Sequence, residues 1–186
     1  MSPQELIACL EDNPVIAAIG DDKWQDALAS PVQVLFYLSS NLLTVKERIC
    51  QAHEADKLVM VHIDLAEGIG KDNSGIQYLT NCGTDGIIST KANMIRLAKN
   101  HGLIAIQRFF ALDSKGMESI DEMIKNSSPH LIEIMPGVVE KAIRRYSTGK
   151  IPVIAGGLIE TKAEVTGVLR CGALAASTGK KELWYV

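Results

Sequence analysis

Ile154-Ala155-Gly156-Gly157 and Ala175-Ala176-Ser177-Thr178-Gly179 are the two stretches that decide the fold. Each begins as a short apolar run of the kind that forms a buried strand, and each ends in glycine or hydroxyl residues. Glycine lets the backbone approach a ligand closely, and backbone N–H groups together with hydroxyls hold a phosphate dianion well. The two stretches therefore predict two strands that end at one phosphate-binding corner.

These residues also fit a simpler description, a tight turn at Gly156-Gly157 and an ordinary helix cap at Ser177-Thr178. Their place in the chain favours phosphate, because they end the seventh and eighth of a series of apolar runs. The recurrent phosphate site of eight-stranded βα barrels uses the loops after strands seven and eight and the start of a short helix. Residues 179–184 are the candidate for that helix.

Apolar runs recur along the whole chain, and most are continuous, as expected for parallel strands that are covered on both faces. Helical patterns lie between them at residues 45–55, 94–100, 117–125 and 139–146, and after the capping box at Thr161–Glu164. The eight runs are Val15–Ile19, Val32–Leu38, Leu58–Ile63, Gly86–Ile88, Leu103–Ile106, Leu131–Met135, Pro152–Ala155 and Ala173–Ala176.

This alternation predicts an α/β fold, a single (β/α)8 barrel of the TIM type, with one domain over residues 1–186. A short N-terminal helix over residues 1–12, opened by a capping box at Ser2–Glu5, precedes a barrel over residues 14–184. The chain is short for this fold, which typically takes about 250 residues. The weakest units are 22–29 and 72–80, and without either of them an open doubly wound sheet is the alternative.

Composition narrows the functional classes. The chain of 186 residues is 47% hydrophobic and 22% charged, so it can bury a core, and its net charge of −3 argues against nucleic-acid binding by bulk electrostatics alone. It begins without a signal-peptide pattern, and no apolar stretch has the length of a membrane span. The four scattered cysteines form no C-x-x-C pair, so we expect reduced thiols, no metal and a cytoplasmic location.

In barrels of this kind the residues that follow each strand form the binding site. Lys91 and Arg108 follow the fourth and fifth runs, and each either contacts an anionic ligand or pairs with a carboxylate at the rim. Glu133 lies within the sixth run, where a carboxylate needs a partner, so we expect it near Arg108 or at the ligand.

His62 and Asp64 share one face of the third strand and its end. With Glu67 they could ligate a divalent metal or exchange protons, but a hydrogen-bonded pair that orients the ligand's hydroxyls is the favoured interpretation. Residues 68–75 are rich in glycine and polar side chains, which fits either a mobile lid or an ordered loop. Lys141, Arg144 and Arg145 form a basic helix face, which is either solvated or a nucleic-acid contact.

The longest motifs resemble those of the GlpP family, the glycerol-3-phosphate-responsive antiterminators of bacterial glycerol uptake operons. The resemblance runs from Asn13 to Trp184, so it covers nearly the whole chain. The motifs are VHIDLAEG (61–68), DGIISTK (85–91), QRFFALDS (107–114), IEIMPGV (132–138), IPVIAGGLI (151–159) and STGKKELW (177–184).

The resemblance implies a barrel-folded regulator that binds glycerol 3-phosphate, acts on the leader mRNA of glycerol genes, needs no cofactor and has no catalytic activity. A homo-oligomer is left open. The shared segments imply that one set of residues surrounds the ligand, and the roles within it follow from position. These residues are His62, Asp64, Lys91, Arg108, Glu133, Gly156, Gly157, Ser177 and Thr178.

Two hypotheses about function follow. The first is a ligand-gated regulator, in which glycerol 3-phosphate favours the state that binds RNA. Because the chain is acidic, RNA affinity would then rest on a restricted basic patch such as Lys141, Arg144 and Arg145. The alternative is a TIM-barrel enzyme of the isomerase or aldolase type, with Lys91 as a Schiff base and Asp64 or Glu133 moving protons.

Overall fold

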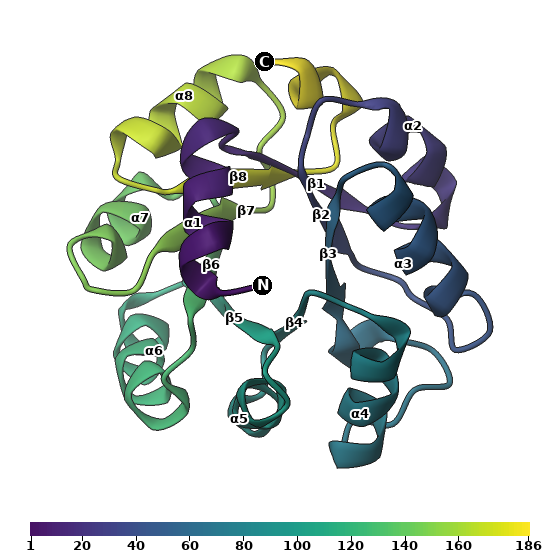
Figure 1. The fold of residues 1–186 in the computed structure, drawn as a ribbon. Helices are drawn as coiled ribbons and strands as arrows, with labels where there is room; N and C mark the ends of the chain where they lie inside the picture. The colour runs from purple at the N-terminus through teal and green to yellow at the C-terminus, as the bar shows by residue number, and fades with distance from the viewer.

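The computed structural model describes residues 1–186, apart from the side chain of residue 114. Its described residues form eight parallel strands in chain order, and the last strand pairs with the first to close a barrel (Figure 1). The (β/α)8 prediction is therefore confirmed, and the open doubly wound sheet is excluded. Closure places the end of β8 beside the end of β1, so the loops after β7, β8 and β1 share one corner.

The strands are short and coincide with the predicted runs, but β4, β7 and β8 continue one or two residues further and β5 continues four residues further, to Phe110. Arg108 is therefore a strand residue rather than a loop residue, and it stands opposite Glu133 in the β5–β6 register. The strands are β1 (Val15–Ile19), β2 (Val34–Tyr37), β3 (Leu58–His62), β4 (Gly86–Ser89), β5 (Ile104–Phe110), β6 (Leu131–Met135), β7 (Val153–Gly156) and β8 (Ala175–Thr178).

Helices surround the barrel, and both weak units of the sequence pattern form them. α4 contains Gly75, where a Cβ would lie 1.8 Å from the Gly70 carbonyl oxygen, so glycine is needed for this close approach. The helices are α2 (Trp24–Ala29), α3 (Val45–Glu54), α4 (Asn73–Cys82), α5 (Ala92–Asn100), α6 (Ser114–Ser127), α7 (Glu140–Ser147) and α8 (Lys162–Arg170), with 3-10 turns η1 (Asp21–Lys23), η2 (Ile63–Leu65) and η3 (Lys181–Tyr185).

The predicted N-terminal helix is α1 (Pro3–Asp12), and both hydrogen bonds of its Ser2–Glu5 capping box are present. It crosses the end of the barrel at which the strands begin (Figure 1). Leu6 and Leu10 are fully buried and pack with the side chains of the barrel interior, such as Phe36. α1 therefore closes this end of the barrel with an apolar plug.

Two apolar layers hold the barrel together, because successive strand residues point to opposite sides. On β5, Ile104 and Ile106 point into the barrel, while Ala105 packs outward against the helices. The inward series continues upward into polar residues at the ends of the strands, where Arg108 follows Ile106 and Ser177 follows Ala175. We call this end, which bears the carboxyl ends of the strands, the mouth.

The glycine-rich segment at residues 68–75 is an ordered loop followed by the first turn of α4. The backbone carbonyl of Glu67 accepts a hydrogen bond from the Leu42 N–H (2.9 Å). The Lys71 ammonium donates to the carbonyls of Ala66 and Ile69. Asp72 caps α4 by accepting from the Gly75 N–H (2.9 Å). These contacts favour the ordered-loop alternative over a mobile lid. Among the described residues, no helix is long and apolar enough to cross a membrane.

Candidate functional site

A cavity of about 380 Å³ opens at the mouth, where β6, β7, β8 and β1 end. It stands where the glycine and hydroxyl stretches of the sequence predicted a phosphate corner. Five of the predicted ligand residues line it, namely Arg108, Glu133, Gly157, Ser177 and Thr178. The remaining four predicted residues do not line it, namely His62, Asp64, Lys91 and Gly156.

Gly156 and Gly157 have different structural roles at this corner. Gly156 follows Ile154 on the inner face of β7, where a Cβ would lie 2.2 Å from Glu133 Oε1, so the missing side chain leaves room for that carboxylate. Gly157 has φ +76° and Leu158 has φ +59°, two consecutive residues in the left-handed region. A leucine with positive φ is strained, and such strain occurs mainly where a loop has a functional shape to keep.

The two hydroxyls of β8 connect the corner to its surroundings. Ser177 Oγ donates to Glu133 Oε1 (2.7 Å) inside the barrel. Thr178 Oγ1 donates to the Ile159 carbonyl (2.7 Å) and accepts from the Lys180 N–H (3.1 Å), so it joins the loop after β7 to the loop after β8. These bonds hold both loops in place at the edge of the cavity.

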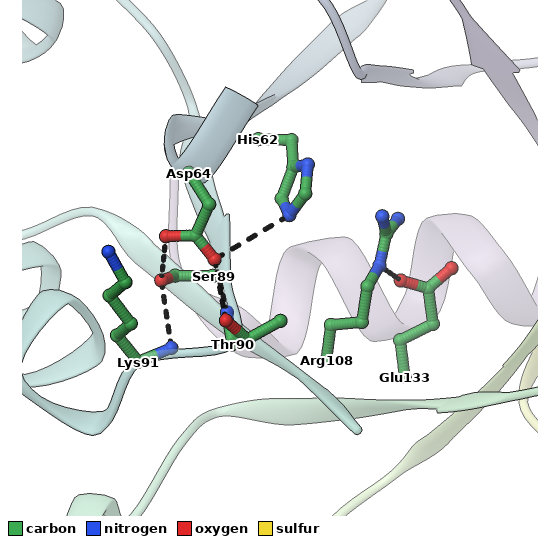
Figure 2. Close-up of polar contacts among 7 residues, drawn as sticks. All are labelled: His62, Asp64, Ser89, Thr90, Lys91, Arg108 and Glu133. Atoms are coloured by element: carbon green, nitrogen blue, oxygen red, sulfur yellow. Dashed lines mark hydrogen bonds and ion pairs between the residues drawn. The ribbon is translucent and has the colours of Figure 1, made fainter. Parts of the chain in front are cut away.

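Arg108 and Glu133 form a buried ion pair across β5 and β6. Arg108 Nε lies 2.6 Å from Glu133 Oε2, and only 8% of the Arg108 side chain and 1% of the Glu133 side chain are exposed. Both oxygens of Glu133 accept hydrogen bonds, one from Arg108 and one from Ser177. Because the pair uses Nε, the two Nη groups of Arg108 point away from the carboxylate (Figure 2). They remain as fixed donors for an anion in the cavity.

A second polar cluster lies at the ends of β3 and β4 (Figure 2). Asp64 accepts hydrogen bonds from Ser89 Oγ (2.7 Å), the Thr90 N–H (2.7 Å) and Thr90 Oγ1 (2.8 Å). Burial alone would raise the pKa of Asp64, but these hydrogen bonds outweigh it and lower the pKa. The carboxylate is therefore ionised and held by its own neighbours.

His62 is buried at the inner side of this cluster, with 4% of the residue exposed. Its Nε2 lies 3.8 Å from Asp64 Oδ2, and neither ring nitrogen has a hydrogen-bond partner among the described residues. Burial, and to a lesser degree the positive charge of Arg108, lower the pKa of His62 to about 4. The ring is thus neutral at physiological pH, with one donor and one acceptor unused.

Lys91 is exposed, and it is its backbone N–H, not its ammonium, that joins the second cluster, by donating to Ser89 Oγ (3.0 Å). Its side chain extends away from Arg108 (Figure 2). The expectation that Lys91 or Arg108 pairs with a carboxylate holds for Arg108, although its partner Glu133 lies within the barrel and not at the rim.

Three charged residues that line the cavity were not predicted from the sequence, namely Lys23, Glu160 and Lys180. Lys23 Nζ donates to the Gly179 carbonyl (2.8 Å), and Lys180 Nζ lies 3.4 Å from Glu160 Oε1. The positions of the two lysines in the sequence could have indicated them, because Lys23 follows the first apolar run and Lys180 follows the last. The cavity is therefore lined by three cations, Lys23, Lys180 and Arg108. Two carboxylates, those of Glu133 and Glu160, also line it.

The predicted basic face of α7 is partly neutralised by acidic neighbours. Arg144 pairs with Glu140 (3.3 Å) and Arg145 pairs with Asp121 on α6 (2.6 Å), while Lys141 is exposed. In the part of the chain that the structure describes, no group of three or more His, Cys, Asp or Glu residues is arranged to hold a metal ion.

The closed barrel, with a cavity at β7 and β8 that is lined by cations and hydroxyls, places the protein in the class of TIM barrels. A family model described as glycerol-3-phosphate responsive antiterminator matches residues 15–184, and the chain belongs to this family.

Individual relatives agree over nearly the full length. The uncharacterised protein YgcP of Escherichia coli K12 is 36% identical over 183 residues, which cover 96% of this chain and 95% of that protein. The crystal structure of the glycerol uptake operon antiterminator regulatory protein from Listeria monocytogenes is similar, with 35% identity, a TM-score of 0.88, and coverage of 93% of this chain and 95% of that chain.

A glycerol uptake operon antiterminator-related protein from Thermotoga maritima has 34% identity and a TM-score of 0.83, with 91% of this chain and 96% of that chain covered. Solved aldolase structures at 11% and 12% identity share the barrel, and at that distance the likeness shows the fold alone.

Proposed function

We propose that this protein is a cytoplasmic transcription antiterminator that binds glycerol 3-phosphate at the mouth and then acts on the leader mRNA of glycerol uptake and catabolism genes. The observation that carries the proposal is the cavity at the ends of β7 and β8, where Gly157, Ser177 and Thr178 meet three cations. Family membership supplies the ligand and the kind of output.

The charges of the cavity favour a phosphate monoester. Arg108 offers its Nη groups from a position fixed by Glu133, and Lys23 and Lys180 add positive charge at the same corner. Among the described side chains, the ion-pair partner of Lys180 is the exposed Glu160, and exposed pairs contribute at most about 1 kcal/mol. A phosphate dianion can therefore replace Glu160 as the partner of Lys180 at small cost.

The glycerol part of the ligand would face the other predicted residues. His62 has a donor and an acceptor unused beside the cavity, which suits a hydroxyl, because a hydroxyl both donates and accepts. In this proposal Asp64 orients that part of the mouth, Lys91 adds charge at its rim, and Gly156 leaves space for Glu133.

Geometry gives the enzyme alternative less support. A Schiff-base lysine has to reach the bound carbonyl, and Lys91 extends to solvent outside the cavity. Asp64 and Glu133 both have their oxygens occupied by hydrogen bonds, so neither is poised as a general base. We therefore propose a regulator without catalytic activity.

Thermal unfolding with added ligand tests the site. Glycerol 3-phosphate at 100 times its Kd should stabilise the protein by about 2.7 kcal/mol, whereas free glycerol should have no effect at the same concentration. Equal effects of the two compounds would contradict the phosphate site.

A gel shift with leader RNA of a glycerol operon, with and without glycerol 3-phosphate, tests the output. The ligand should strengthen RNA binding, because only a difference in affinity between two states couples the sites. No RNA binding under either condition, together with turnover of a sugar phosphate, would establish the enzyme instead.

A further inference from the structure

A second cavity, of about 350 Å³, lies on the outside of the barrel between α6 and α7. Its floor is apolar and consists of Ile124, Ile132, Ile151 and the buried Tyr146, while basic side chains stand around it. We call it the α6–α7 groove. It shares no lining residue with the mouth cavity, so it is a separate feature of the surface.

The rim of the groove is basic on a chain whose net charge is −3. Lys125, Arg145 and Lys150 line it against a single carboxylate, that of Asp121. Asp121 is paired with Arg145 at 2.6 Å, and Glu118 also lies close enough to act on Arg145. Among the described side chains, Lys125 and Lys150 have no ion-pair partner. The excess positive charge is therefore concentrated at these two exposed lysines.

An apolar floor beneath two unpaired lysines is complementary to a nucleotide. The floor can take the face of an unstacked base, and the lysines can each neutralise a phosphate of the backbone. A-form duplex RNA hides its base edges in a deep, narrow major groove, so base insertion of this kind requires a single strand.

We propose that the α6–α7 groove is the place where single-stranded leader RNA docks, with its phosphates on Lys125 and Lys150 and a base on the apolar floor. This inference rests on the proposed function, since it names the surface through which that function would be exerted. It moves the main RNA contact from the α7 face, where Arg144 and Arg145 are already paired, to the two lysines of the adjoining groove, which Arg145 also lines.

Strand β6 places this groove back to back with the mouth. Ile132 points outward into the groove floor, and the next residue, Glu133, points inward to Arg108 and Ser177. α7, which borders the groove, follows Met135 of the mouth cavity after a four-residue connection, 136–139. A shift of β6 or its loop on ligand binding would therefore act on both sites.

The decisive experiment measures leader-RNA binding by fluorescence anisotropy across a range of salt concentrations, with glycerol 3-phosphate present. Lys125→Ala/Lys150→Ala should weaken binding by about tenfold or more and reduce the slope of log K against log[salt] by about 1.4, the loss of two single-strand phosphate contacts. Thermal stabilisation by glycerol 3-phosphate should be unchanged, because neither lysine touches the mouth.

The matched control is Lys46→Ala/Lys162→Ala, which removes two exposed lysines from α3 and α8 and should leave the RNA affinity and the salt slope as in the wild type. If the groove variant binds RNA like the wild type, the groove is not the RNA surface, although the antiterminator function stands. If the wild type itself binds no leader RNA, the proposed function fails. Competition by polyglutamate as strong as that by RNA would assign the groove to an acidic protein partner and overturn the proposal.

Discussion

Figure 2 shows two polar clusters at the mouth, each built around a carboxylate. They differ in whether their residues line the cavity. In the β3–β4 cluster, Asp64 accepts three hydrogen bonds from Ser89 and Thr90 and lies outside the cavity. In the β5–β6–β8 cluster, Glu133 accepts from Arg108 and Ser177, and all three residues line the cavity.

The difference separates a cluster that mainly shapes the mouth from one that lines the cavity. Asp64 fixes the start of the loop after β4 by binding its backbone and side chains. Glu133 instead holds Arg108 through Nε, so the two Nη groups of the guanidinium point away from the carboxylate (Figure 2), and Arg108 lines the cavity. His62 stands between the two, buried and without a hydrogen-bond partner in either (Figure 2).

The largest effect is expected from separating Arg108 and Glu133. Arg108→Ala leaves a carboxylate buried without its counter-charge, which should destabilise the fold by about 3–5 kcal/mol and abolish stabilisation by glycerol 3-phosphate. Chemical denaturation with and without the ligand measures both effects.

The control replaces both partners, as Arg108→Met/Glu133→Leu. An apolar pair of similar volume should restore most of the stability while ligand binding stays lost, because no buried charge remains unpaired. Retention of ligand binding in this double variant would remove the pair from the site.

His62 should make stability depend on pH. Its pKa of about 4 in the fold lies below the ordinary value of 6.5, so the unfolded chain takes up the proton first as pH falls. Stability is then complete above about pH 6.5 and decreases by up to about 3 kcal/mol as the pH falls to 4. Urea denaturation at a series of pH values measures this slope.

His62→Gln supplies the comparison, because an amide carries no proton in this range. Its stability should fall less steeply between pH 6.5 and 4, and the residual slope belongs to other groups, including His130, whose pKa burial also lowers. Identical slopes in the two proteins would show that His62 is not held neutral by burial.

The smallest effect is expected at Lys91. Lys91→Ala should weaken glycerol 3-phosphate binding by no more than about fivefold, since an exposed charge contributes at most about 1 kcal/mol. Lys23→Ala, at a half-buried cavity residue, should weaken it by roughly tenfold or more. Calorimetric titration of both variants measures the contrast, and the reverse order would place the ligand at the β3–β4 cluster.

Sequence was sufficient for the fold, because continuous apolar runs and helix signals depend on local chemistry. The Thr161–Glu164 capping box, for example, forms as predicted at the start of α8. The pairing of Glu133 with Arg108 was one of the two outcomes expected for Glu133, since a carboxylate within an apolar strand requires a partner.

Which residues line the cavity was harder to predict from the sequence. The order of residues places Lys91 and Arg108 at the same end of the barrel, but it does not show which of the two side chains points into the barrel. That depends on strand length, since β5 extends to Phe110 and keeps Arg108 on its inner face, while β4 ends at Ser89 and leaves Lys91 beyond it. Lys23 comes into the cavity only because β8 closes on β1, a contact between the two ends of the chain.

Helix α1 determines from which end small molecules can reach the barrel. Since Leu6 and Leu10 seal the end where the strands begin, small molecules have to enter and leave at the mouth. A macromolecule seated across the mouth would then trap whatever the cavity holds and slow its escape, without touching it. The residence time of the ligand would thus lengthen whenever a macromolecule covers the mouth.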